Sequence, residues 1–371
     1  MVGPKAFIHL EHLFHNYNLI KQQLNGTPIM AVVKANAYGH GAVPIVKALR
    51  SKGVNHFAVF TFEEALELKA AGIEEDILVF CRPTKDILSE AAKRNIALNL
   101  SAIEDLPLFI EAEPSPKFHL KVDTGMSRLG IPFNLAADTL QQIKRNGHLK
   151  CEGIYSHYAT ADEGELSYAE HQLEQFNQVL HAAKELDLNI KYIHFSNSGT
   201  VLNMPQTCFN LVRVGILLYG AFPSDEVPMD MPIKPVMEFK GPVVALREIS
   251  AGTKVSYGGV WEAPQDTVIG VIQPGFADGF PRSWYVNGYV GLRGKNYPIA
   301  GRICMDQFMV DFSGADVRVG DEVLIFGQNE TEAIHIEDIA QAIGSTSYVL
   351  LTAVGGRTER IFINLAVGKA N

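Results

Sequence analysis

Eight short apolar segments recur along the first 214 residues, and amphipathic helical patterns separate most of them. The apolar segments are residues 29–33, 57–60, 77–80, 96–100, 118–122, 153–156, 192–195 and 211–214. The clearest helical patterns are residues 11–24, 42–51, 63–71, 135–145 and 168–185. Strands that alternate with helices indicate a parallel sheet, and a count of eight is typical of an α/β fold, the (β/α)8 TIM barrel. A doubly wound sheet is the alternative, but it gives no reason for eight strands, and no GxGxxG motif follows the first one.

The pattern changes after the eighth segment. Residues 221–234 are rich in Pro, Asp and Met, which is typical of a linker. Short β-type segments with glycine turns follow, at residues 243–246, 267–272, 289–292, 297–300, 308–311 and 322–326. One helical pattern interrupts them at 336–343. We therefore predict two domains, a barrel over residues 1–234 and a smaller, mostly-β domain over residues 235–371.

Polar residues follow several of the predicted barrel strands. In this fold the chemistry lies at the carboxyl ends of the strands, and phosphate binds after strands seven and eight. The polar side chains are Lys34 after strand one, those of residues 123–128 after strand five, His157 after strand six, Asn197 and Ser198 after strand seven, and Arg213 in strand eight. Gly215 and Ile216 follow strand eight and offer backbone amides. Ser198 and the backbone amides near Gly215 are suitable donors to a phosphate.

Lys34 stands at the end of a run of buried-type residues. A charged amine in that position costs desolvation free energy. Burial lowers the pKa of a lysine, and a neutral amine can attack an aldehyde to form a Schiff base. Asn36, Tyr38 and His40 place polar groups on a glycine-containing loop that a ligand can approach. The competing interpretation is a surface lysine at a strand end, because lysines are rarely buried.

Composition narrows the possible partners and location. The 371 residues carry a net charge of −9 without a basic run, which argues against nucleic acid and anionic membranes as partners. Residues 1–10 lack the features of a signal peptide, and no apolar run approaches membrane-spanning length. Cys81, Cys151, Cys208 and Cys304 form no CxxC pair. We therefore expect free thiols, a cytoplasmic location and no metal site.

Eight motifs, in this order, resemble those of the pyridoxal-phosphate (PLP) dependent alanine racemases. They read AVVKANAYGHG (31–41), HLKVDTGMSRLG (119–130), EGIYSHYATADE (152–163), SNSGT (196–200), FNLVRVGILLYG (209–220), VSYG (255–258), PGFADG (274–279) and GRICMDQ (301–307). One such motif is only suggestive, whereas eight in order across both predicted domains are specific. The resemblance covers nearly the whole chain. It implies a PLP enzyme that interconverts L-alanine and D-alanine and supplies D-alanine for cell-wall peptidoglycan.

The resemblance also implies a two-base mechanism. Lys34 holds PLP as a Schiff base and, once the substrate amine displaces it, acts as the base on one face of the α-carbon. Tyr257 is the base on the opposite face. A phenol has a pKa of about 10, so a cation must stabilise its phenolate, and His157 and Arg213 would supply a hydrogen-bonded chain toward it. Arg213, which can donate hydrogen bonds but not accept them, would also keep the pyridine nitrogen unprotonated. This would suppress transamination and decarboxylation.

The remaining roles follow from the resemblance alone. Cofactor contacts are implied for Tyr38, His157, Asn197, Ser198, Arg213, Gly215, Ile216 and Tyr348. Arg128 and the amide of Met305 would bind the substrate carboxylate. A carbamylated Lys121 would orient Arg128; an unmodified Lys121, or one paired with Asp123, is the alternative. The substrate entrance is implied at Asp162, Phe276 and Arg282. The family usually has a tyrosine where this chain has Phe276, so the hydroxyl group of that tyrosine is missing here.

Assembly and two competing functions complete the expectations. The resemblance places the β domain of one subunit over the barrel mouth of the other, which implies a homodimer with composite active sites. One competing function is another PLP barrel enzyme, such as a decarboxylase or a racemase of another amino acid, for example serine. A decarboxylase should place an acid where Arg213 stands. The other is a non-catalytic PLP-binding protein, but such proteins generally lack the domain that carries Tyr257 and Met305.

Overall fold

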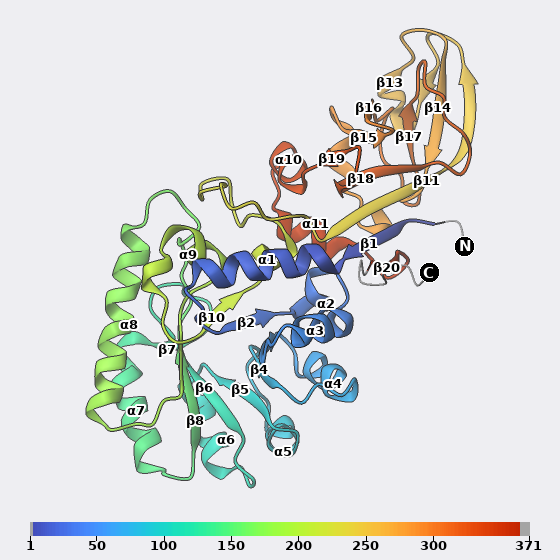
Figure 1. Cartoon of the computed structure of the whole chain (residues 1–371). Coiled ribbons are helices and arrows are strands. Elements are labelled where there is room, and N and C mark those ends of the chain that lie inside the picture. Colours follow the sequence, from blue (N-terminus) through green and yellow to red (C-terminus); the bar gives the residue numbers. More distant parts are fainter. Residues whose placement is uncertain (1–2, 364–371) are drawn as a thin grey trace, which may run out of the picture.

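Eight parallel strands form a nearly closed barrel in the first part of the chain. The computed structural model describes residues 3–363 (Figure 1). The barrel strands are β2 (Ile29–Val32), β3 (His56–Val59), β4 (Asp76–Val79), β5 (Ile96–Leu100), β6 (Lys117–Asp123), β8 (Lys150–Tyr155), β9 (Tyr192–His194) and β10 (Val212–Val214). They pair in the order β10-β2-β3-β4-β5-β6-β8-β9, and the short strand β7 (Ile131–Pro132) pairs with β6. A hydrogen bond of 3.2 Å from the Arg213 amide to the Ser196 carbonyl oxygen bridges the seam between β9 and β10. The predicted barrel is confirmed, and each of the eight predicted segments forms one of its strands.

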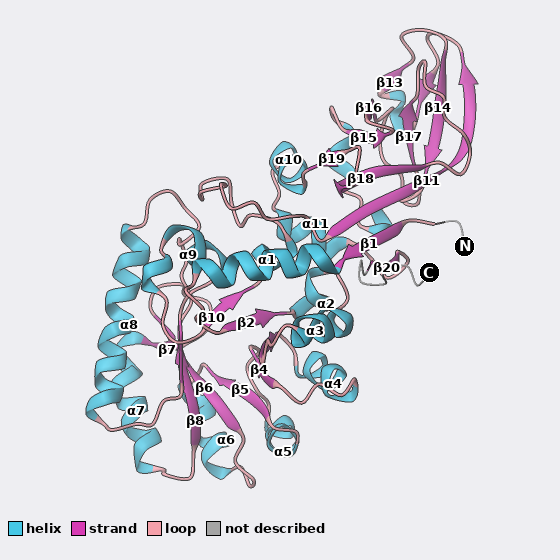
Figure 2. Cartoon of the chain, viewed as in Figure 1, coloured by secondary structure: helices cyan, strands magenta, loops and turns pink. Residues whose placement is uncertain are grey.

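Helices surround these strands on the outside (Figure 2). They are α1 (Leu10–Gln23), α3 (Ala42–Ser51), α4 (Phe62–Ala70), α5 (Lys85–Lys93), α6 (Leu106–Glu111), α7 (Ala136–Arg145), α8 (Ser167–Glu185) and α9 (Ser198–Asn203). The short element α2 (Lys34–Tyr38) follows β2 and is a left-handed turn. Apolar stripes hold them to the barrel; α7, for example, buries Ala136, Leu140 and Ile143 and exposes its charged face. Short 3-10 helices are η1 (Ile103–Asp105), η2 (Phe133–Leu135), η3 (Pro205–Thr207), η4 (Ile216–Tyr219), η5 (Tyr257–Gly259), η6 (Phe276–Asp278) and η7 (Arg282–Tyr285).

The second part of the chain is mostly β, as predicted. Its strands are β11 (Met237–Ile249), β12 (Lys254–Val255), β13 (Trp261–Glu262), β14 (Thr267–Ile272), β15 (Tyr289–Leu292), β16 (Lys295–Pro298), β17 (Phe308–Asp311), β18 (Glu322–Gln328), β19 (Ala333–Ile334) and β20 (Glu359–Ile363). Strand β16 begins two residues before the predicted segment 297–300. The reason is a two-residue hairpin turn at Arg293 and Gly294, with φ of 51° and 77°, which sets the register with β15.

One strand near the start of the chain lies elsewhere than expected. Strand β1 (Lys5–His9) pairs antiparallel with β11 and parallel with β20, so it lies in the sheet of the second part although residues 1–234 were assigned to the barrel. Its alternation buries Ala6 and Ile8 completely against that sheet. The ends of the two predicted domains, residues 1–2 and 364–371, lie outside the described residues.

A second helix was also missed in the β domain. The predicted helix is α10 (Ile336–Ala342), and α11 (Ser347–Ala353) follows it. Helix α11 packs on α2 at the mouth of the barrel, where a Cβ added to Gly39 would lie only 2.3 Å from the Leu351 carbonyl oxygen. The glycine therefore permits a contact that brings the second domain to the barrel.

Two further observations concern thiols and membranes. All four cysteines are free, as expected. Across residues 3–363, no helix combines the length and hydropathy needed to cross a bilayer.

Candidate active site

A cavity of about 550 Å³ opens at the carboxyl ends of the barrel strands. The predicted residues that line it are Lys34, Tyr38, Lys121, Arg128, His157, Asp162, Asn197, Ser198, Arg213, Gly215, Ile216 and Tyr348. Eleven of these come from the barrel region and one, Tyr348, comes from α11. The strand-end rule therefore located residues that the structure gathers around one space.

Lys34 is followed by a left-handed turn. Burial, and then the charge of Arg128, lower the pKa of the Lys34 amine. Residues 35–38 have φ between 52° and 54°, although none of them is glycine. That conformation costs roughly 1–2 kcal/mol per residue. Hydrogen bonds from Ala37 to the Val33 carbonyl (2.8 Å) and onward along the turn help to hold it. Strain of this kind is concentrated at functional sites, because the surrounding structure must maintain it.

The turn directs Tyr38 back toward the end of β10. A Cβ added to Gly215 would lie 2.4 Å from the Tyr38 hydroxyl oxygen, so only glycine fits there. The amide of Gly215 donates to the Ser198 hydroxyl at 3.2 Å. Tyr38 packs between Tyr219 and Tyr348, with ring centroids 4.9 and 6.0 Å away. Burial raises the pKa of Tyr38, so its hydroxyl stays protonated and can donate.

Arg213 lies at the centre of a buried hydrogen-bond network. Its Nη1 donates to His194 Nδ1 and the His194 carbonyl, both at 2.9 Å, and its Nη2 donates to His157 Nδ1 at 3.0 Å and to the carbonyls of Ser156 and Phe195 at 2.8 and 3.0 Å. Because a guanidinium only donates, each imidazole accepts at Nδ1 and carries its hydrogen on Nε2. Burial, followed by the charge of Arg213, holds the pKa of His157 well below its usual range.

Arg213 remains cationic at neutral pH. Burial lowers its pKa to about 10, which still leaves it protonated. Its Nε–H donates to no residue within 3–363, and the side chain lines the cavity. One donor of a fixed cation therefore remains for a ligand.

Lys121 and Arg128 line the same cavity. Burial, and then the charge of Arg128, lower the pKa of Lys121 to about 8. Asp123 accepts two backbone amides of the loop that follows it, both at 3.0 Å, rather than the Lys121 amine. The side chain of Lys121 is thus a buried amine that loses its proton more readily than a free lysine does.

The sequence interpretation missed four aromatic residues of the cavity, one of which, Tyr158, comes shortly after β8. Phe60 and Phe80 line it, and so does Tyr155, whose ring lies 5.3 Å from the Arg213 guanidinium carbon and 5.8 Å from Lys121 Nζ. Phe60, Phe80 and Tyr155 stand at the ends of β3, β4 and β8. Their positions follow the strand-end rule, which holds for aromatic as well as polar residues.

Three of the eight motifs gather on the β domain instead. Hydrogen bonds join them, from the Ser256 hydroxyl to the Arg302 carbonyl (2.5 Å), from the Phe276 amide to the Cys304 carbonyl (3.0 Å) and from the Ala277 amide to the Met305 carbonyl (2.9 Å). Tyr257, Phe276 and Met305 consequently lie on adjoining loops. Their side chains are 67%, 40% and 56% exposed. We call these three residues the exposed cluster.

The exposed cluster does not reach the barrel cavity of its own chain. None of its residues lines that cavity, nor does Arg282 at the start of η7. Strand β13, shortly after Tyr257, lies at the end of the β domain far from the barrel (Figure 1). Of the predicted entrance residues, only Asp162 is at the cavity, where burial raises the pKa of its carboxyl group.

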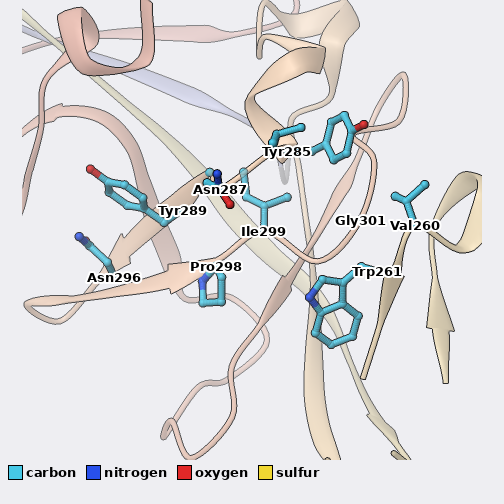
Figure 3. A pocket seen from close by; sticks show the side chains of 11 residues that line it. Val260, Trp261, Tyr285, Asn287, Tyr289, Asn296, Pro298, Ile299 and Gly301 are labelled. Carbon is cyan, nitrogen blue, oxygen red and sulfur yellow. The ribbon is translucent and has the colours of Figure 1, made fainter. Parts of the chain in front are cut away.

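A second cavity, of about 600 Å³, lies within the β domain. Figure 3 shows Trp261, Tyr285 and Tyr289 around it. Its lining also includes Asn287 and Asn296 but no lysine, histidine, arginine or carboxylate. It therefore offers no group for covalent or acid–base chemistry at neutral pH.

Comparison with known proteins agrees with this geometry. Residues 8–223 match the family model "Alanine racemase, N-terminal domain", and residues 236–362 match "Alanine racemase, C-terminal domain". The chain is 36% identical over 363 residues to "Alanine racemase 2" of Caldanaerobacter subterraneus subsp. tengcongensis, covering 96% of this chain and 94% of that protein. It is 35% identical over 364 residues to the alanine racemase of Carboxydothermus hydrogenoformans, covering 96% and 99%. The chain belongs to the alanine racemase family.

Solved alanine racemase structures support the same fold. The crystal structure of the enzyme from D-cycloserine-producing Streptomyces lavendulae has a TM-score of 0.93 and 33% identity, covering 98% of both chains. The Bacillus anthracis alanine racemase with bound L-Ala-P has a TM-score of 0.91 and 32% identity, covering 98% of this chain and 96% of that one. Racemases are isomerases, so the predicted enzyme class is confirmed.

Proposed function

We propose that this chain binds PLP and racemises alanine, using Lys34 and Tyr257 as bases on opposite faces of the substrate. The observation that carries the proposal is the pairing of Lys34, a half-buried amine of lowered pKa, with Arg213, a fixed cation with one donor left, around a single cavity. A lysine of lowered pKa is a good nucleophile and base at neutral pH.

The lining of the cavity fits PLP. Lys34 would hold the aldehyde carbon, and Arg213 Nε–H would meet the pyridine nitrogen. The hydroxyl groups of Tyr38 and Ser198 lie together beside Gly215, where they suit a phosphate. We assign the other implied cofactor contacts to Asn197, Ile216 and Tyr348, which line the same space. When bound, PLP supplies an electron sink that makes the substrate α-proton removable.

We propose a role for each remaining residue. Arg128 would bind the substrate carboxylate by a bidentate pair. The Lys34 amine would take or return a proton on one face of the α-carbon. His157, which carries hydrogen on Nε2, would donate to the Tyr257 oxygen on the opposite face and stabilise its phenolate. A donor-only Arg213 disfavours a decarboxylase, which profits from a protonated ring nitrogen.

We further propose a homodimer in which the exposed cluster of one subunit completes the cavity of the other. Tyr257 and Met305 are both exposed and neither lines the cavity of its own barrel, which is how residues of a composite site would lie in a single chain. Burial of such residues by a partner also removes their apolar surface from water. In this arrangement Phe276 and Arg282 would face Asp162 across the entrance.

Lys121 is proposed to be carbamylated. Its neutral amine would attack carbon dioxide, forming an N–C bond and losing one proton, and the resulting anion would orient Arg128. We expect NMR of protein incubated with isotopically labelled bicarbonate to show one carbamate signal per chain. Lys121→Ala is the control, and the same signal in that variant would rule out this assignment.

Incubation with L-alanine tests the proposed function directly. We expect the circular dichroism of L-alanine to decay to zero while the amount of amino acid stays constant, because racemisation removes only the handedness. L-serine, run in parallel, should lose its signal at least about tenfold more slowly, since a pocket separates close analogues by factors of this size. Loss of the amino acid itself, or faster loss of the serine signal, would contradict the assignment.

We place the enzyme in the cytoplasm as a source of D-alanine for peptidoglycan, and rescue of a D-alanine-requiring bacterium would test this role.

A further inference from the structure

Glu64 joins the ends of two neighbouring barrel strands. Its Oε1 accepts the Ala35 amide at 2.6 Å. Its Oε2 accepts the amides of Phe60 and Thr61 at 2.8 and 3.1 Å. One half-buried carboxylate thus links the turn after β2 with the turn after β3, and both of its oxygens are used. Glu64 does not line the cavity, and neither its spacing nor its type pointed to a role in the site.

The amide that Glu64 holds belongs to the peptide bond between Lys34 and Ala35. The internal hydrogen bonds of the left-handed turn come from the amides of residues 37, 39, 40 and 41 instead. Glu64 is therefore the partner of the Ala35 amide within residues 3–363. The plane of this peptide sets the last backbone angle of Lys34 and the first one of the turn. Fixing the plane fixes the direction in which the lysine side chain leaves the backbone.

We propose that Glu64 is a positioning residue that clamps this peptide, holds the start of the left-handed turn and so aims the Lys34 amine into the cavity. The inference rests on the proposed function of Lys34. The positive charge of Arg128 lowers the pKa of the Lys34 amine, and the carboxylate of Glu64 raises it. Loss of Glu64 therefore also changes the electrostatic environment of Lys34.

Glu64→Gln separates the clamp from the other task of this residue. Glu64 also closes a capping box at the start of α4, in which its own amide donates to the Thr61 hydroxyl at 3.2 Å. A glutamine has a single acceptor oxygen. If that oxygen keeps the two amides of Phe60 and Thr61, the NH₂ group faces the Ala35 amide, where two donors meet and no bond forms. The variant thus breaks the clamp while it keeps the side-chain half of the cap.

Thr61→Ala is the matched control. It removes the hydroxyl of the same capping box and leaves the Glu64 carboxylate on the Ala35 amide. Both substitutions touch the capping box of α4, and thermal unfolding of each variant measures any loss of stability there. Only Glu64→Gln should disturb Lys34.

Two measurements test the clamp. In the protein without cofactor, hydrogen exchange of the Ala35 amide should become at least about tenfold faster in Glu64→Gln and stay unchanged in Thr61→Ala. In the holoenzyme, kcat for alanine should fall about tenfold in Glu64→Gln, with KM within about twofold, because the lysine base is misaligned while the carboxylate contacts remain. Glu64→Asp keeps the charge but cannot span the distance, so it should behave like Glu64→Gln.

Two outcomes would overturn the inference. One is a match between Glu64→Gln and Thr61→Ala in both exchange and kcat. The other is full recovery in Glu64→Asp, which would show that charge alone acts on Lys34. If the wild-type protein racemises no amino acid, the proposed function fails, while the exchange comparison still decides whether the clamp exists.

Discussion

We expect Lys34→Ala to abolish covalent attachment of PLP and to slow racemisation of alanine by at least about 10³-fold, because one residue supplies both the anchor and one of the two bases. Borohydride reduction followed by peptide mapping measures the attachment. In the wild-type protein the label should be found on a peptide that contains Lys34. In the variant no lysine should carry it.

A second lysine in the cavity makes this a demanding test. Lys121 is also buried, has a lowered pKa and lines the same space. The two differ in their surroundings, since Lys34 leads into the turn that carries Tyr38 to Gly215 and Lys121 lies beside the ring of Tyr155. Lys121→Ala should therefore retain the label on Lys34. A label on Lys121 in the wild-type protein or in Lys34→Ala would show that the anchor has been misassigned.

Mixing two inactive variants should restore activity. Lys34→Ala lacks the anchor in the barrel, and Tyr257→Phe lacks the second base in the exposed cluster. If the sites are composite, a mixed dimer holds one site with both defects and one with neither. Random pairing of equal amounts makes about half the dimers mixed, so roughly a quarter of wild-type activity should return.

The control is a mixture that cannot complement. Lys34→Ala mixed with the double variant Lys34→Ala/Tyr257→Phe has no intact anchor, so it should stay inactive at any ratio. Subunit exchange is verified separately with labelled chains. Inactivity of the first mixture despite exchange would exclude the cross-subunit site and leave the racemase assignment untouched.

The barrel could be predicted because its signals are local. Each strand is a short run of buried residues, and the eighth ends at Val214, close to its predicted limit. Polar residues at the strand ends converge because parallel strands end on one side of the barrel. Lys34, His157 and Arg213 were found in this way, while Tyr257 and Met305 depended on the family resemblance.

The features that were missed depend on contacts between distant residues. Strand β1 could be placed only by its pairing with β11 and β20. Helix α11 directly follows α10 after a short turn, and its place on α2 rests on a contact between distant parts of the chain. Glu64 acts through backbone amides, and no pattern of residue types reveals which amide a carboxylate will accept.

The pairing of β1 with β20 also orders the events of synthesis on the ribosome. Lys5 pairs with Glu359 and His9 pairs with Ile363, so more than 350 residues separate the two partners. The barrel strands, which lie between residues 29 and 214, are all made before β20 emerges. The barrel segment can thus begin to fold while one edge of β1 is still unpaired. The sheet that contains β1, β11 and β20 is completed only after nearly all the chain has been made.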